Sequence, residues 1–276
     1  MKTFKSFSES DNNLIIFDAL NLAFRWKHSG AAEFCDDYIK TVASLVRSYG
    51  AEKVLIACDK GSSSYRKQLY PQYKQNRKDK FELQTEAERL QFEAFFKEFE
   101  HTLDTLAEHY PILRFQGVEA DDIAAYVVSQ RAKLGVKHTW LISSDRDWDL
   151  LVKPDVSRFS YVTRKEVTEE NWHEHYEFNP EDYISIKCLN GDSGDNVAGV
   201  PGIGPKRATD LVREFGSAWD IIASLPVVGK NKYIQNLNQC GELLQLNYKL
   251  MDLETHCGEA IGEANLKQIN EILEIL

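Results

Sequence analysis

The chain has 276 residues, of which 43% are hydrophobic, 11% aromatic and 28% charged, and this composition excludes disordered, collagen-like and disulfide-scaffold proteins. Its 43 acidic and 33 basic residues give a formal charge of −10, which by itself argues against a nucleic-acid partner. No apolar run reaches the ~18 residues of a membrane span, and residues 1–9 lack the apolar core of a secretory signal. Five widely spaced cysteines indicate reduced thiols in a cytosolic protein.

Three apolar runs each lead directly into aspartate. They are residues 14–17 before Asp18, 54–58 before Asp59, and 140–144 before Asp145 and Asp147. Such runs are typical of strands buried on both faces of a parallel sheet, and helical patterns at 34–49 and 120–134 lie between them. The sequence therefore predicts a doubly wound, mostly parallel α/β sheet, with a further strand at 157–163. Because ligands bind at the carboxyl ends of such strands, we expect these aspartates to meet.

Residues 60–110 interrupt this alternation. From Lys60 to Lys80 the chain carries seven bases and one acid, a net charge of +6, with tyrosines between the bases. Pro71 predicts a helix start, after which Lys74, Arg77 and Phe81 would share one face. Residues 81–108 are typical of a long helix. A solvated charged surface is the ordinary interpretation of a charge run, but long insertions in a sheet tend to carry function.

Beyond residue 165 the pattern becomes helical. A helix is predicted from Asn179-Pro180 to near residue 190, with others at 206–215 and 233–250 and a weak one from Thr255. We therefore expect two domains. They are an α/β core over 1–165 with an insertion at 65–110, and a helical lobe over 166–276.

Further carboxylates accompany the strand-end aspartates. Glu119, Asp121 and Asp122 open the helix at 120, where one or two acids would complement the helix dipole, and Asp192 and Asp195 lie in a loop that turn formation alone explains. Nine acids at one edge would repel one another unless cations lay among them. Oxygen ligands without histidine or cysteine select Mg²⁺ or Mn²⁺, and paired ions of this kind catalyse displacement at phosphorus. Without these nine acids the balance is 34 against 33 bases, so the argument against nucleic acid fails.

A glycine-rich string follows at 199–208, reading G-V-P-G-I-G-P-K-R-A. A hairpin of this form before a helix presents backbone N–H groups and a helix N-terminus to phosphate. This is the helix–hairpin–helix pattern of sequence-independent DNA binding, predicted here over about 184–216. The residues expected to contact DNA are Gly202, Gly204, Lys206 and Arg207.

Six ordered motifs over about 14–250 resemble the flap endonuclease and 5′→3′ exonuclease family, especially its bacteriophage members, and the 5′-nuclease domain of bacterial DNA polymerase I. They are I-I-F-D, Y-K-x-x-R, G-V-E-A-D-D, I-S-S-D-R-D-W-D, G-D-S-G-D-N and the glycine-rich string. The resemblance implies a PIN-like fold with the insertion as a helical arch that admits a free 5′ strand. Ala19 and Arg146 depart from the family's usual residues, but neither removes an acid.

The resemblance also assigns roles to residues. It implies a first metal site from Asp18, Asp59, Glu119 and Asp121, with Asp122 alongside among the catalytic residues. It implies a second site from Asp145, Asp147, Asp192 and Asp195. Lys74 and Arg77 would contact the scissile phosphate, Tyr73 the unpaired nucleotides, and Arg25 the DNA. The cofactors would be two or three Mg²⁺ or Mn²⁺ ions, with K⁺ at the hairpin.

The sequence thus predicts a monomeric, metal-dependent, structure-specific 5′ nuclease that hydrolyses DNA at branched, flapped or nicked duplexes in replication or repair. It would work in the cytoplasm, that of the host cell for a viral protein, with a separate DNA polymerase as partner. Two alternatives stay open, a non-catalytic DNA-junction binder and a related nuclease that prefers RNA primers. A haloacid-dehalogenase-type phosphatase needs D-x-D after the first strand, and the sequence there is Asp18-Ala19-Leu20.

Overall fold

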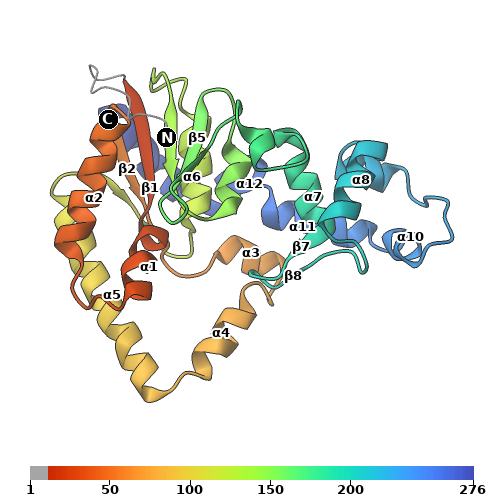
Figure 1. The fold of residues 1–276 in the computed structure, drawn as a ribbon, viewed down its shortest axis with the longest axis horizontal. Coiled ribbons are helices and arrows are strands. Elements are labelled where there is room, and N and C mark those ends of the chain that lie inside the picture. Colours follow the sequence, from red (N-terminus) through yellow and green to blue (C-terminus); the bar gives the residue numbers. More distant parts are fainter. Residues whose placement is uncertain (1–11) are drawn as a thin grey trace.

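A six-stranded sheet forms the centre of the computed structural model, which describes residues 12–276; residues 1–9, where no secretory signal is predicted, lie outside this range (Figure 1). The strand order is β3-β2-β1-β4-β5-β6, and every pairing is parallel except that of β6 with β5. The strands are β1 (Asn13–Asp18), β2 (Ala51–Ala57), β3 (Ile112–Leu113), β4 (Thr139–Ile142), β5 (Val156–Ser160) and β6 (Lys165–Val167). The predicted doubly wound, mostly parallel sheet is confirmed.

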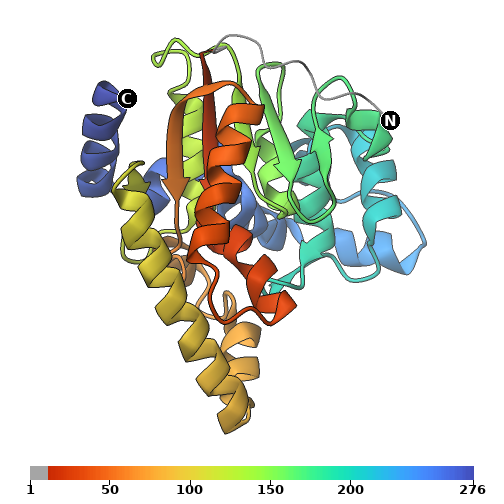
Figure 2. The ribbon, with the colours of Figure 1, turned by 60° about the vertical axis from the view of Figure 1, so that its left-hand side comes forward.

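Helices cover both faces of the sheet, because alternate strand residues point in opposite directions. Ile15 and Phe17 of β1 face α1 (Ala19–Ser29), α2 (Cys35–Ser48) and α5 (Glu86–Ala107), which lie together in Figure 2. All four apolar residues of β1 are fully buried, which accounts for the continuous apolar run in the sequence.

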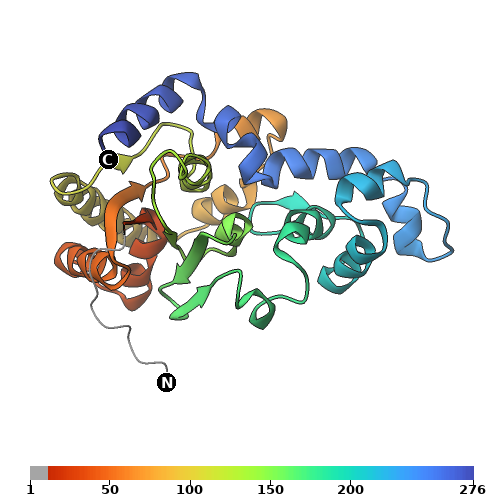
Figure 3. The same cartoon turned by 90° about the horizontal axis from the view of Figure 1, so that it is seen from above.

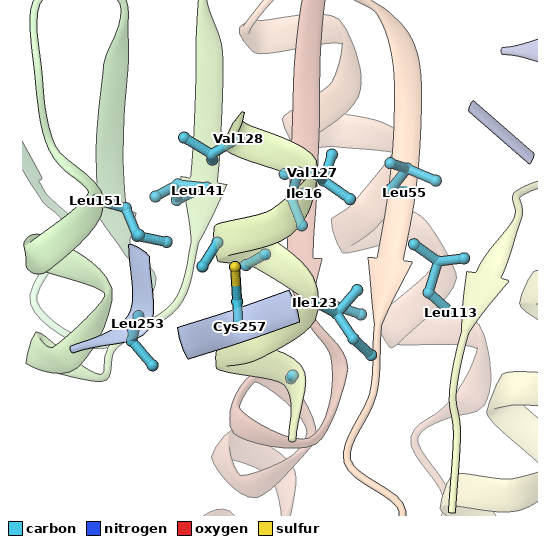
Figure 4. Close-up of a cluster of buried hydrophobic side chains, with 14 of the residues drawn as sticks. Ile16, Leu55, Leu113, Ile123, Val127, Val128, Leu141, Leu151, Leu253 and Cys257 are labelled. Atoms are coloured by element: carbon cyan, nitrogen blue, oxygen red, sulfur yellow. The ribbon is translucent and has the colours of Figure 1, made fainter. Parts of the chain in front are cut away.

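The other face carries α6 (Ala120–Ser129), α12 (Leu253–Ile261) and α13 (Glu263–Ile275). Figure 4 shows α6 between the strands and α12, with Ile123 of α6 and Cys257 of α12 in the same cluster. The last two helices of the chain thus complete the core of the sheet domain. The domain boundary at 165/166 stays a prediction.

Residues 64–107 leave the sheet edge as α3 (Ser64–Leu69), α4 (Gln75–Glu82) and the long α5. In Figure 1, α4 and the first half of α5 project beyond the carboxyl ends of the strands and meet at a turn. The prediction that a helix begins at Pro71 is wrong. Lys74 has φ +57°, and its amide donates to the carbonyl of Asp195 at 2.9 Å, so this tertiary contact takes Lys74 out of the helix.

The remaining elements form a lobe beside the sheet, at the end away from α2 (Figure 3). They are α7 (Tyr183–Asn190), β7 (Gly191–Asp192), β8 (Val197–Ala198), α8 (Pro205–Phe215), α9 (Ala218–Ala223), α10 (Lys232–Leu237) and α11 (Gly241–Met251). Short 3-10 turns also occur at Arg146–Leu151, which packs against the sheet, and at Trp172–Glu174 and Pro180–Asp182. The single helix predicted over 233–250 is wrong, because the chain leaves the helical path between α10 and α11. Within residues 12–276, no helix is long and apolar enough to cross a membrane.

Candidate active site

Acidic side chains collect at the carboxyl edge of the sheet, as predicted. Asp18 ends β1, Asp59 follows β2 and Asp145 follows β4, while Asp121 lies in the first turn of α6. Two of them also begin helical turns, since Asp18 accepts from the amide of Asn21 at 3.2 Å and Asp145 from the amide of Asp147 at 3.0 Å. The capping interpretation is therefore true locally, but it accounts for only one oxygen of each carboxylate.

These acids raise one another's affinity for protons. Burial, together with the charge of Asp59, raises the pKa of Asp18 to about 8, although the hydroxyl of Ser143 donates to it at 2.7 Å. Burial and the charges of Asp145 and Asp59 hold the pKa of Asp121 well above its usual range. Such a group of carboxylates is electrostatically incomplete without cations.

A second acidic group lies where the β7–β8 hairpin meets the sheet. Oxygens of Asp147, Asp192 and Asp195 lie within 4.8 Å of one another. Both ends of this hairpin need glycine, because a Cβ at Gly191 would lie 2.2 Å from the amide nitrogen of Gly199, and one at Gly199 would lie 2.1 Å from a backbone oxygen. This close backbone approach fixes the two ends of the loop that carries Asp192 and Asp195.

Lys187 of α7 bridges this group, with Nζ 2.5 Å from Asp147 and 3.2 Å from Asp192. Burial alone would lower the pKa of Lys187, but the two carboxylates outweigh it and raise that pKa. The sequence analysis missed Lys187. Its only signal was a lone base in a mostly apolar helix, five residues before Asp192.

Glu119 is held by four donors, all from the start of the insertion. Its Oε1 accepts from the amide of Ser63 at 3.1 Å and from Lys74 Nζ at 2.8 Å, and its Oε2 accepts from the Tyr73 hydroxyl at 2.9 Å and from Arg66 at 3.4 Å. Burial works to raise the pKa of Glu119, but Lys74 and Arg66 outweigh it, so that pKa lies below its usual range. Glu119 is therefore ionised and fixed in place.

The predicted basic residues also reach Asp195. Arg77 donates to its Oδ1 at 2.5 Å and Lys74 lies 3.6 Å from its Oδ2. The Tyr73 hydroxyl lies 2.9 Å from that oxygen and shares its single proton between Asp195 and Glu119. Tyr73 is buried, whereas Arg77 is exposed. The structure thus brings Tyr73, Lys74 and Arg77 into the carboxylate group, where the charges of Lys74 and Arg77 offset part of its negative charge.

Asp122 has a different environment from the other acids. It is fully buried, and both of its oxygens accept from Arg66, at 2.7 Å each. Burial raises the pKa of Asp122, and the Arg66 guanidinium works against that rise. Arg66 is the second residue that the sequence analysis did not single out.

The residues present fit divalent metal ions. All eight predicted ligands offer carboxylate oxygens, which Mg²⁺ and Mn²⁺ prefer, and three of them already converge without an ion. In addition, three cationic side chains (Lys74, Arg77 and Lys187) lie against the same carboxylates. The site therefore has both the ligand type and the excess negative charge that such ions require.

The glycine-rich string forms a turn before α8, as predicted. Gly202 has φ +84°, its carbonyl accepts from Arg207 at 2.6 Å, and Gly204 precedes the helix. Tyr233 of α10 supports the turn, because its side chain lies beside Gly202 and 4.8 Å below the Arg207 guanidinium. Lys206 is exposed in the first turn of α8.

Arg25 lies apart from the acids, on the exposed side of α1. Its guanidinium donates to the hydroxyl of Tyr161 at 2.8 Å and lies 4.4 Å from that ring, and Arg164 lies 4.8 Å from the same ring. Together with His28 and Val162 these residues line an open cavity of about 520 Å³. Arg164 and Tyr161 thus lie beside Arg25, which the sequence analysis expected to contact DNA.

Two family descriptions cover nearly the whole chain. Residues 13–177 match the 5′-3′ exonuclease N-terminal resolvase-like domain, and residues 178–271 match the 5′-3′ exonuclease C-terminal SAM fold. The chain is 43% identical over 272 residues to the flap endonuclease of Escherichia phage T5, covering 96% of this chain and 93% of that protein. It is also 31% identical over 215 residues to DNA polymerase I of Bacillus caldotenax, covering 71% of this chain and 22% of that protein.

Solved structures agree with this similarity. The T5 5′-exonuclease with bound zinc matches with a TM-score of 0.92 at 43% identity, and the T5 flap endonuclease in a complex with DNA and metal ions matches with a TM-score of 0.91 at 42% identity. Each alignment covers 95% of this chain and 98% of the other. The fold and the acidic edge thus define a nuclease with a PIN-like core and a helical lobe.

The chain belongs to the 5′-3′ exonuclease family. It is an enzyme of the structure-specific 5′ nuclease type, and not a non-catalytic junction binder.

Proposed function

We propose that this nuclease hydrolyses phosphodiesters of DNA that carries a 5′ single-stranded flap or end, at branched or nicked duplexes, with two or three Mg²⁺ or Mn²⁺ ions. The observation that carries the proposal is the set of carboxylates at one sheet edge with Lys74 and Arg77 among them. The similarity to the T5 enzyme in a complex with DNA and metal ions supports it.

The metal ligands would come from two groups. Asp18, Asp59, Glu119 and Asp121 would form the first, and Asp145, Asp147, Asp192 and Asp195 the second. When bound, divalent ions supply positive charge at the phosphate and lower the pKa of an attacking water. Attack of that water on the phosphate would leave a 5′-phosphate and a 3′-hydroxyl on the two products.

The chain's own cations bind and orient the phosphate. Lys74 and Arg77 now neutralise Glu119 and Asp195, and they would turn to the scissile phosphate once metal ions replace them there. Both remain charged throughout, because the neighbouring carboxylates raise the pKa of each above its usual value despite burial. The donors are therefore preorganised for negative charge at the reacting group. Tyr73 would lie near the unpaired nucleotides.

The DNA would extend over three surfaces. The turn at Gly202 and Gly204, with Lys206 and Arg207, would bind duplex phosphates and a K⁺ ion. Helices α4 and α5 would admit the free 5′ strand. Arg25 and Arg164 would bind a further stretch of backbone, since each guanidinium lies against Tyr161 rather than a carboxylate. We further propose that the protein acts as a monomer in the cytoplasm. There it would work with a separate DNA polymerase.

Cleavage of a 5′-labelled flap duplex tests this function. We expect release of the single-stranded arm with Mg²⁺, none with EDTA, and none for Asp145→Asn, which keeps its DNA affinity. Asp104→Asn, an exposed acid on α5, is the matched control and should cleave normally. Binding without cleavage under any divalent metal would contradict the proposal, and faster removal of an RNA arm than a DNA arm would assign a primer-removing role instead.

A further inference from the structure

The pair formed by Arg66 and Asp122 is the most deeply buried ion pair near the carboxylates. Arg66 is 3% exposed and Asp122 is 0% exposed. Each oxygen of Asp122 accepts from a different terminal nitrogen of Arg66, at 2.7 Å, which is the two-pronged geometry of the strongest arginine–carboxylate pairs. Both oxygens of Asp122 are thus committed to the guanidinium.

Arg66 has two further partners. Its Nε donates to the carbonyl of Leu250 at 2.7 Å, and its Nη1 lies 3.4 Å from Oε2 of Glu119. One guanidinium therefore joins α3 at the base of the insertion, α6, and the end of α11. A small movement would be enough to shift the Arg66 guanidinium from Asp122 towards Glu119, because its Nη1 already contacts both carboxylates.

Glu119 depends on the same segment. Ser63 donates its amide to Glu119 and accepts from the amide of Arg66 through its hydroxyl, so the start of α3 and Glu119 are linked directly. The contact between the segments is tight, because a Cβ at Gly117 would lie 2.1 Å from the Ser64 hydroxyl oxygen. A displacement of Arg66 would therefore move the donors of Glu119.

We infer that Arg66 and Asp122 form a positioning pair in which Asp122 neutralises Arg66 and keeps this guanidinium from competing with metal ions for Glu119. Asp122 is then neither a metal ligand nor a group that touches the substrate, which departs from the role that the family resemblance implies for it. The inference rests on the proposal that Glu119 is a metal ligand. Removing one partner of a buried ion pair is costly, whereas replacing both partners by apolar residues is often tolerated.

This gives a test by paired substitution. Asp122→Leu leaves Arg66 with Glu119 as its nearest carboxylate, so we expect the affinity for Mn²⁺, measured by electron paramagnetic resonance, to fall by about 10- to 100-fold. The double variant Arg66→Met with Asp122→Leu should recover about tenfold or more of that loss. The value of kcat at limiting Mn²⁺ should follow the affinity, while KM for a flap duplex stays unchanged. A double variant no better than Asp122→Leu would overturn the inference.

A milder variant covers the case in which the leucine variants do not fold. Asp122→Asn should bind the same number of Mn²⁺ ions per chain as the unaltered protein, with reduced affinity, and loss of one ion would make Asp122 a ligand and overturn the inference. Asp155→Asn is the control, because it removes an arginine–aspartate pair with Arg131 just beyond the other end of α6, and its Mn²⁺ affinity should be unchanged. Glu119→Gln separates the two proposals, since normal Mn²⁺ affinity there would contradict the metal site itself.

Discussion

Lys74 is held in the left-handed region by its surroundings. Its amide contacts the carbonyl of Asp195 and its ammonium group contacts Glu119, so the backbone and side chain each bind a different acidic residue. A left-handed conformation costs a non-glycine residue roughly 1–2 kcal/mol, which these two contacts offset. These contacts hold the Lys74 side chain at the acidic group before DNA arrives, close to where we propose the phosphate binds.

Replacing this side chain should affect the chemistry more than binding. We expect Lys74→Ala to lower kcat on a flap duplex by about 100-fold, because it removes a charged donor from the reacting group, with a smaller change in KM. Lys78→Ala is the matched control on α4, where Lys78 is exposed and pairs only loosely with Glu82 at 3.8 Å. Equal losses in the two variants would show that the general charge of the insertion matters and the position of Lys74 does not.

That the acids gather could be predicted from the sequence, because strand ends and helix starts fix where such residues meet, whereas the basic pair came from the family resemblance. Arg66 and Lys187 could not. Arg66 finds Asp122 across 56 residues and Lys187 finds Asp147 across 40, so only the folded chain shows that each base is paired rather than solvated. From the sequence alone, the partner of a single charged residue cannot be identified when that partner lies far away along the chain.

The turn before α8 leads into the N-terminus of that helix, and Tyr233 of α10 packs against it. Gly202 has φ +84°, and Tyr233 of α10 lies within 4 Å of where a Cβ would be. A Cβ at 202 would only touch Tyr233, but the positive φ would strain the backbone, and we expect this strain to shift the amides proposed to face phosphate.

A substitution pair tests this element. We expect Gly202→Ala to weaken binding of unbranched duplex about tenfold, measured by fluorescence anisotropy in EDTA. Gly135→Ala is the control, because Gly135 has φ +63°, open space around it, and lies outside the hairpin. It should lose similar stability and bind DNA normally. If the two variants bind alike, backbone strain at the turn has no part in DNA affinity.

Elements whose conformation is set by their own residues were predicted well from the sequence. Strands β1, β2 and β4 come from apolar runs that need burial, and α7 starts just after Asn179-Pro180 as expected. The helix start at Pro71 failed because a contact with the distant acidic loop decides the conformation of Lys74. The break between α10 and α11 likewise has no strong signal in the residues that form it.

At the scale of the whole molecule, the buried carboxylates make the stability of the metal-free protein depend on pH. Asp18 keeps a proton up to a pH of about 8 when folded, whereas its unfolded value is 3.8, and the raised pKa values of Asp59 and Asp121 act in the same direction. Between those limits the folded state binds more protons than the unfolded state. The free energy of unfolding therefore falls as pH rises, by up to about 1.4 kcal/mol per pH unit for each group.

This predicts a pH dependence that metal ions reverse. In EDTA, the melting temperature should fall between about pH 5 and pH 8, and Asp18→Asn should flatten that slope. With Mg²⁺, stabilisation should grow with pH, because the ligands must be deprotonated to bind it. Calorimetry under both conditions measures this. A melting temperature in EDTA that rises over this range would contradict the account of Asp18.

The return of α12 to α6 has a consequence for synthesis. The helix that carries Asp121 is buried between the strands and residues 253–261, so a nascent chain that has emerged only as far as α11 has every carboxylate but an open core. The core over α6 can therefore close only when α12 is present. A shortened chain that stops before residue 253 should keep the acids of the site but lack the packing that holds Asp121 in place.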